Sequence, residues 1–280
     1  MTLHAADVSF AYGPREVLRE LDCAFPAGRI TAIVGANASG KSTLLRAMAR
    51  LVKPQSGAVL LDGAEIATLP TREVARRVGF LPQSPVAPEG LTVGDLVARG
   101  RYPHQRLGRP QSAHDRERIA WALEATGTTE LRDRPLDQLS GGQRQRVWIA
   151  MVLAQDTGVL LLDEPTTYLD LAHQLEVLDL LCELNERDGR TIVLVLHDLN
   201  QACRYAHHLV AMRDGAVHAA GPPREIVDAE LVLAVLNLRA EVLDDPVSGA
   251  PLCIPLTRAA RAASGEGATP LQAARATASS

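Results

Sequence analysis

The chain has 280 residues, of which 46% are hydrophobic and 22% charged, and this composition is typical of an ordinary soluble globular protein. Such a length corresponds to about two domains, or to one large domain with a smaller insertion, and its core needs neither a disulfide nor a structural metal. The net charge of -4 argues against nucleic acid as a partner, because neutralising phosphates needs a concentrated basic surface.

The four cysteines lie far apart and form no C-x-x-C pair, which predicts reduced thiols that behave as small hydrophobic residues. They are Cys23, Cys182, Cys203 and Cys253. The N-terminus has neither a charged nor an apolar signal region, and the longest apolar run, residues 147–154, is much shorter than the about 20 residues of a spanning helix. We therefore expect a chain that is neither secreted by that route nor itself transmembrane.

The first half of the chain predicts a strand, a loop and a helix in succession. An apolar run over residues 30–34 is followed by a glycine-bearing turn and by a helix over residues 41–51 with one apolar face. Two further apolar runs, residues 159–162 and 191–196, do not alternate with polar residues, as is typical of parallel strands covered on both faces. The predicted fold is α/β, with a mainly parallel sheet and some antiparallel elements.

Between Gln83 and Leu139, prolines separate the helical stretches 92–99 and 113–126, and this pattern predicts a helical subdomain inserted at about residues 84–140. The following segments predict a hairpin turned at Asp214-Gly215, one helix over residues 223–236 and a final pair of apolar segments around 246–249. Residues 257–280 are rich in Ala, Ser, Thr and Gly, so we expect a disordered tail.

Residues 35–42 fit the pattern G-x-x-x-x-G-K-[ST] and stand between the predicted strand and helix, where that motif belongs. Its backbone N–H groups and the helix N-terminus would hold phosphates, with Lys41 on the β- and γ-phosphates and the Ser42 hydroxyl on Mg²⁺. One of only two lysines stands there, which argues against an ordinary turn. The predicted nucleotide-binding residues of this loop are Gly35, Ala36, Asn37, Ala38, Ser39, Gly40, Lys41, Ser42 and Thr43.

Two carboxylates, Asp163 and Glu164, end the strand at residues 159–162. Asp163 would lie near a metal, and Glu164 would activate water, although surface carboxylates also commonly end strands. The sequence Leu-Ser-Gly-Gly-Gln at residues 139–143 precedes a helix over 144–154, and Ser140 is a good N-cap. A simple cap gains nothing from two glycines, whereas a phosphate can approach their bare backbone N–H groups.

With this LSGGQ sequence the chain resembles the ATP-binding-cassette ATPases, over about residues 1–256. The resemblance implies ATP and Mg²⁺ as ligands, and two cassettes in a head-to-tail sandwich. In it, Ser140, Gly141, Gly142 and Gln143 of one subunit close over ATP held by Lys41 of the other. We therefore expect a second copy of the chain as a partner.

The resemblance also implies individual roles, by position. Tyr12 corresponds to the aromatic that stacks on adenine, Gln83 to the Q-loop glutamine, Asp163 to the Walker B aspartate, Glu164 to the catalytic base, Asp170 to the D-loop aspartate and His197 to the switch histidine. The implied Mg²⁺ residues are Ser42, Gln83 and Asp163. Taken alone, Tyr12 and His197 are also compatible with ordinary packing. The sequence departs from the commoner family loop at Ala36 and Ala38, where Pro and Gly are frequent, and a methyl group at residue 38 restricts the backbone.

Further segments, residues 81–83, 87–90, 99–104 and 166–174, resemble the ATPase subunits of iron(III)-siderophore importers. The resemblance implies a subunit on the cytoplasmic face of the cell membrane, bound to an integral-membrane permease and acting indirectly with a substrate-binding protein. The 102–103 segment would meet the permease. Haem and cobalamin importers share much of this pattern, and a cytosolic ATPase of the iron–sulfur-assembly type is the alternative from another class. A GTPase is disfavoured, because no Asn-Lys-x-Asp segment occurs.

Overall fold

The computed structural model describes residues 1–105 and 110–256. Its central sheet has the strand order β10-β9-β3-β8-β7-β6, and the five strands from β9 to β6 are parallel, whereas β10 pairs with β9 antiparallel. The strands are β3 (Ile30–Gly35), β6 (Val78–Leu81), β7 (Val159–Asp163), β8 (Thr191–Val195), β9 (His208–Arg213) and β10 (Ala216–Gly221). The predicted α/β class is confirmed.

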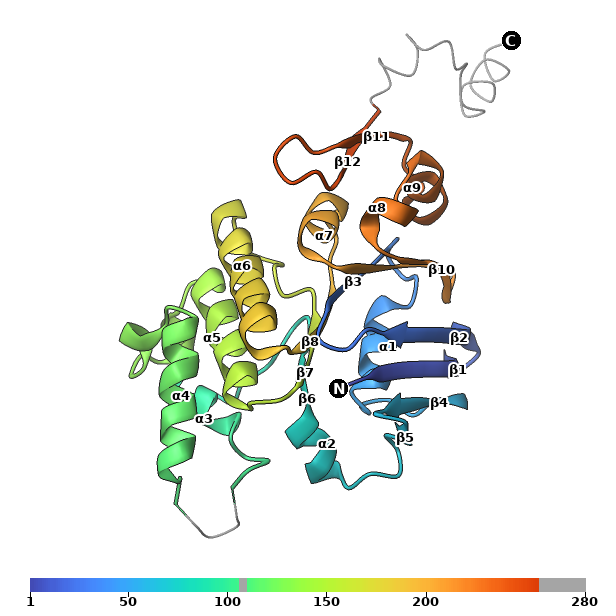
Figure 1. Cartoon of the computed structure of the whole chain (residues 1–280). Coiled ribbons are helices and arrows are strands. Elements are labelled where there is room, and N and C mark those ends of the chain that lie inside the picture. Colours follow the sequence, from blue (N-terminus) through green and yellow to red (C-terminus); the bar gives the residue numbers. More distant parts are fainter. Residues whose placement is uncertain (106–109, 257–280) are drawn as a thin grey trace, which may run out of the picture.

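A second, antiparallel sheet has the order β2-β1-β4-β5, with β1 (Leu3–Tyr12), β2 (Arg15–Phe25), β4 (Ser56–Leu61) and β5 (Ala64–Glu65). Helix α1 (Lys41–Met48) belongs to the apolar core between this sheet and one face of the central sheet. The other face of the central sheet packs against helices, as Figure 1 shows. Since β3, β7 and β8 are buried along their whole length, their sequences do not alternate between apolar and polar residues.

Helices fill the chain between β6 and β7, as the proline-punctuated sequence predicts. They are α3 (Val93–Arg99), α4 (Ala113–Ala125), the short 3₁₀ helices η1 (Thr129–Leu131) and η2 (Leu136–Gln138), and α5 (Gly141–Ala154); α2 (Thr71–Arg77) precedes β6. Thr92 and Ser112 begin α3 and α4 with capping boxes, in which an aspartate three residues later returns the hydrogen bond. The boundaries of an inserted subdomain at 84–140 remain a prediction.

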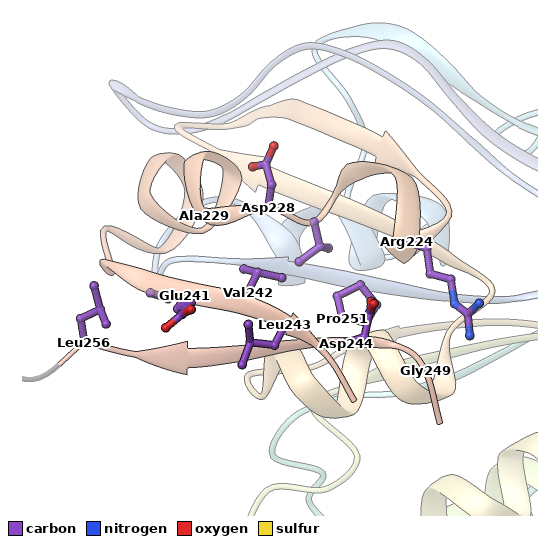
Figure 2. A pocket seen from close by; sticks show the side chains of 12 residues that line it. Arg224, Asp228, Ala229, Glu241, Val242, Leu243, Asp244, Gly249, Pro251 and Leu256 are labelled. Carbon is purple, nitrogen blue, oxygen red and sulfur yellow. The ribbon is translucent and has the colours of Figure 1, made fainter. Parts of the chain in front are cut away.

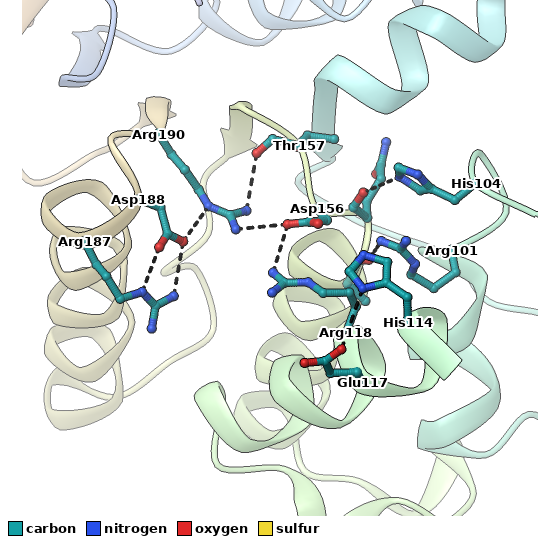
Figure 3. A network of polar contacts seen from close by, with 12 residues as sticks. Arg101, His104, His114, Glu117, Arg118, Asp156, Thr157, Arg187, Asp188 and Arg190 are labelled. Carbon is teal, nitrogen blue, oxygen red and sulfur yellow. Dashed lines mark hydrogen bonds and ion pairs between the residues drawn. The ribbon is translucent and has the colours of Figure 1, made fainter. Parts of the chain in front are cut away.

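Polar contacts join α4 to the central sheet at Asp156, which follows α5 (Figure 3). Its Oδ1 lies 2.9 Å from Nη2 of Arg118 on α4 and 3.3 Å from Nη2 of Arg190, which precedes β8. The Arg118 guanidinium also lies 4.1 Å from the centre of the Trp121 ring, within the range of a cation–π contact. One carboxylate therefore ties the helical layer to the start of β8.

The C-terminal part contains α6 (Leu171–Asp188), α7 (Leu199–Tyr205), β11 (Ala240–Asp244) and β12 (Pro251–Pro255), and the hairpin turned at Asp214-Gly215 is confirmed. The single helix predicted over 223–236 is wrong. Two helices, α8 (Pro223–Ile226) and α9 (Ala229–Leu236), occupy that range, because Val227 is extended and Asp228 caps α9 by accepting a hydrogen bond from the Leu231 N–H at 2.7 Å. The predicted tail over 257–280 lies outside the described residues.

All four cysteines are free thiols, and three of them are buried, as the sequence predicts. Burial raises the pKa of Cys23 and that of Cys203 to about 12. In residues 1–105 and 110–256, the helices include none with the length and apolar character needed to traverse a bilayer.

A hollow of about 1090 Å³ lies beside α8, α9 and the β11–β12 hairpin (Figure 2). Its charged lining residues are Arg224, Asp228, Glu241 and Asp244. None of the sequence-predicted site residues lines it, so the chemistry that the sequence predicts is located elsewhere in the fold.

Candidate nucleotide site

The loop between β3 and α1 is bounded by two glycines that no other residue can replace. Gly35 and Gly40 have φ values of 154° and 101°, and a Cβ atom would lie 2.4 Å from the Met212 carbonyl oxygen at the first and 2.9 Å from that of Val17 at the second. Gly40 is the N-cap of α1, and no side chain caps the helix there. The positive end of α1 thus faces the loop, as an anion site requires.

Ala38 lies in the left-handed region, with φ 65°, at the exposed rim of the loop. Its methyl group costs about 1–2 kcal/mol in that conformation, which explains why the glycine that is frequent at this position in the family fits better. The backbone restriction expected at residue 38 is therefore real. Beside it, the buried Oγ of Ser39 has no hydrogen-bond partner among the described residues.

The ammonium group of Lys41 is buried within the loop. Its Nζ donates hydrogen bonds of 2.9 Å to the carbonyl oxygens of Gly35 and Ala36. Burial lowers the pKa of Lys41, whereas the nearby Glu164 and Asp163 carboxylates act in the opposite direction. The cation therefore lies where the loop carries phosphates in proteins with this motif.

Ser42 and Asp163 bring the loop to the end of β7. The Ser42 hydroxyl donates to Oδ1 of Asp163 at 2.8 Å, while the buried Oδ2 of that residue has no partner among the described residues. Burial raises the pKa of Asp163, and the hydrogen bond from Ser42 lowers it. A hydroxyl beside a carboxylate with a free oxygen fits Mg²⁺, which binds one or two carboxylates together with substrate phosphates.

Three side chains surround the carboxylate of Glu164, which has φ 54° directly after β7. Gln83 Nε2 donates to Oε2 at 2.6 Å, the Thr167 hydroxyl donates to the same oxygen at 3.1 Å, and Nε2 of His197 lies 2.6 Å from Oε1. The structure thus brings together the glutamine, glutamate and histidine that the sequence predicts for hydrolysis. Thr167 was missed, and its only signal is its place three residues after the base.

Among the described residues, no hydrogen bond or ion pair joins Tyr12 or Asp170 to this cluster. Tyr12 ends β1, and its half-exposed ring lies edge-on against Phe10, with ring centroids 4.8 Å apart. Asp170 caps α6, with Oδ1 accepting from the His173 N–H at 3.0 Å. The roles of Tyr12 in stacking on adenine and of Asp170 in the D-loop remain predictions.

The predicted N-cap of α5 is confirmed. The Ser140 hydroxyl accepts a hydrogen bond from the Gln143 N–H at 3.2 Å, and the Gln143 side chain returns one to the Ser140 N–H. Within the described ranges, no hydrogen bond joins residues 140–143 to residues 35–43. The space around Gly141 is open, since a Cβ there would meet only the Tyr168 carbonyl, at 3.9 Å, whereas a Cβ on Gly142 would lie 3.3 Å from Cδ2 of Leu169.

A parallel strand that enters a glycine loop and a helix, with an acidic pair at the end of a nearby strand, defines a P-loop nucleotide-binding protein. The sequence profile of the ABC transporter family matches residues 18–167. The chain belongs to this family, as an ATP-binding subunit that hydrolyses ATP.

Curated relatives cover nearly the whole described chain. The "Probable siderophore transport system ATP-binding protein YusV" of Bacillus subtilis is 56% identical over 89% of this chain and 90% of its own length. The ferric enterobactin transport ATP-binding protein FepC of Escherichia coli is 52% identical over 92% of this chain and 95% of its own length.

Solved structures show the same fold. An inward-facing ABC transporter of metal-chelate type matches with a TM-score of 0.79 and 29% identity, over 92% of this chain and 98% of the matched chain. A dimeric bacterial ABC transporter cassette matches with a TM-score of 0.70 and 29% identity, over 79% of this chain and 98% of its own.

Proposed function

We propose that this chain powers the import of iron(III)-siderophore complexes, as a homodimer bound to the cytoplasmic side of a membrane permease. The observation that carries the hydrolytic part is the position of Glu164. Its carboxylate lies among Gln83, Thr167 and His197, beside the loop that holds Lys41. The cargo is supported by relatives named for siderophore and ferric enterobactin transport.

The reaction is an in-line attack of water on the γ-phosphate of ATP, without a phosphoenzyme. Lys41 neutralises charge on the β- and γ-phosphates, and Glu164 orients the water and accepts its proton. Ser42, Asp163 and Gln83 would hold Mg²⁺, which supplies positive charge to the phosphate oxygens when bound. His197, whose Nε2 lies 2.6 Å from Oε1 of Glu164, would contact the γ-phosphate when ATP is bound.

The signature residues act on a second copy of the chain. Ser140 and Gln143 hold the N-terminus of α5 in a capping box, and the space around Gly141 stays open. This arrangement suits a phosphate brought by another subunit, because bare N–H groups and the helix dipole both favour an anion. ATP contacts from both halves would favour the closed dimer, and hydrolysis would remove that preference.

The permease contact is assigned to the segment after α3. Tyr102 is 60% exposed there, while its neighbour Arg101 is fully buried. Aromatic side chains are enriched at protein–protein interfaces, so an exposed tyrosine beside a buried arginine suits such a contact. The subunit would be peripheral to the membrane, with a substrate-binding protein acting through the permease.

Uptake of radio-iron-labelled ferric siderophore by cells with and without the gene tests this proposal. Expression of the protein should restore uptake, and the Glu164→Gln variant should not. Pull-down of the tagged protein should recover an integral-membrane permease. Restored uptake of hemin or cobalamin, with no effect on ferric siderophore, would contradict the cargo. Recovery of no membrane protein would favour a cytosolic ATPase.

A further inference from the structure

Two glutamines outside the predicted site form a continuous chain of hydrogen bonds between α6 and α7. Gln174 Nε2 donates to the Leu169 carbonyl oxygen at 3.0 Å, and its Oε1 accepts from Gln201 Nε2 at 2.8 Å. The Gln174 amide is therefore a donor on one side and an acceptor on the other, which fixes its orientation. Gln201 is 9% exposed, so its amide depends on protein partners.

The Leu169 end of this chain touches the signature corner of the same subunit. A Cβ on Gly142 would lie 3.3 Å from Cδ2 of Leu169, and Leu169 immediately precedes Asp170. The side chain of Leu169 thus lies beside the diglycine corner, while its carbonyl group accepts the hydrogen bond from Gln174.

The Gln201 end of this chain reaches the first turn of α7, which directly follows His197. The Gln201 N–H donates to Oδ1 of Asp198, the N-cap of α7, at 3.0 Å. His197 directly precedes this cap, and its Nε2 lies 2.6 Å from the Glu164 carboxylate. A shift of the first turn of α7 would therefore move His197 relative to the Glu164 carboxylate.

We propose that Gln174 and Gln201 are positioning residues that couple the two nucleotide sites of the dimer. Closure of residues 140–143 on the partner's ATP shifts Leu169, and the two amides carry this shift to α7 and His197 in the same subunit. This inference rests on the proposed head-to-tail sandwich. Because each amide would be left unsatisfied without the other, the pair acts as one unit.

The test uses the full-length protein and a double-mutant cycle with Gln174→Met and Gln201→Met, which keep the side-chain length. ATP hydrolysis is measured across ATP concentrations, together with thermal unfolding. Each single variant should lower kcat about fivefold, with little change in KM, and should reduce the Hill coefficient to about 1. The double variant should match the single variants rather than show about a twenty-five-fold loss.

Gln174→Glu is the second probe, since it keeps the acceptor for Gln201 and replaces the donor to Leu169 by a negatively charged oxygen that faces the Leu169 carbonyl. It should lose cooperativity as Gln174→Met does, and it keeps the proposal testable if Gln201→Met fails to fold. Gln155→Met is the matched control. It removes hydrogen bonds from a glutamine to the carbonyl oxygens of Ala75 and Val78, and should leave kcat and the Hill coefficient unchanged.

The outcomes separate this inference from the function on which it rests. A parent protein without ATP hydrolysis contradicts the proposed function itself. If the parent protein hydrolyses ATP without cooperativity, the proposed coupling is overturned. It is also overturned if the variants at Gln174 and Gln201 keep the kcat and the Hill coefficient of the parent. Loss of cooperativity in Gln155→Met, or independent effects of the two glutamines, would also overturn it.

Discussion

Nε2 of His197 lies 2.6 Å from Oε1 of Glu164. The switch histidine that the sequence predicts for the γ-phosphate therefore contacts the base in this structure, and Gln83 contacts the other oxygen. The glutamine and histidine that the sequence predicts for nucleotide sensing thus both contact the predicted base.

We expect Glu164→Gln to lower ATP hydrolysis by about 10²–10⁴-fold while sparing ATP binding, because the amide cannot accept the proton of the attacking water. The ATP-bound dimer should then accumulate. Phosphate release and size-exclusion chromatography with and without ATP measure the two effects. Glu130→Gln, at an exposed position on η1, is the control and should behave as the parent. Unchanged turnover in Glu164→Gln would reject Glu164 as the base.

Lys41→Ala should weaken nucleotide binding itself, by about 10- to 100-fold, because charge-assisted hydrogen bonds contribute about 1.5–3 kcal/mol. Equilibrium titration with a fluorescent ATP analogue measures the change. The chain provides an unusually direct control in Lys53, its only other lysine, which is exposed. Lys53→Ala removes the same charge away from the loop and should keep full affinity. Equal affinities for the two variants would contradict the role of Lys41.

The loop and the central strands could be predicted because their signals are local. A glycine pattern between an apolar run and an amphipathic segment determines β3, the loop and α1 together. The predicted end of α1 at residue 51 was too late, because Arg50 turns into the left-handed region with φ 58° and the helix ends at Met48. The periodicity of the sequence contains no signal for that reversal.

Contacts that depend on the tertiary structure could not be predicted from the sequence. Thr167 binds Glu164 only because the turn after β7 places Glu164 at φ 54° and brings the threonine back over it. The Gln174–Gln201 hydrogen bond joins α6 and α7, and no local sequence pattern predicts how these two helices lie relative to each other. The break at Val227 and Asp228 was missed for a different reason, since apolar residues continue on both sides of it.

Ala38→Gly should stabilise the protein by about 0.5–1 kcal/mol. It relieves about 1–2 kcal/mol of left-handed strain, and part of this gain is lost because glycine has more conformational freedom in the unfolded chain. Ala36→Gly is the matched control, two residues away in the same exposed rim but without positive φ. Ala36→Gly should destabilise the protein, because it relieves no strain in the folded state and only increases the conformational freedom of the unfolded chain. Urea unfolding measures both variants, and the same sign for both would contradict the strain at residue 38.

Arg101, in the segment after α3, and Asp115 on α4 form a buried ion pair, with Nε donating to Oδ1 at 2.9 Å. Burial acts to raise the pKa of Asp115, but hydrogen bonds from Arg101 and Ser112 outweigh it and hold that pKa at about 2. Asp115→Asn leaves the buried guanidinium without its counter-charge, so we expect a loss of about 3 kcal/mol in unfolding free energy at neutral pH.

The same pair predicts how this loss depends on pH. A carboxyl group whose pKa is lower in the folded than in the unfolded chain stabilises the fold above its ordinary value of 3.8, and this stabilisation disappears as the pH falls toward about 2. The difference between the parent and Asp115→Asn should therefore be constant above about pH 5 and shrink below about pH 4. Urea unfolding across this range measures it, with Asp137→Asn, at an exposed position, as the control. A difference that grows on acidification would show that the Asp115 carboxylate does not stabilise the fold.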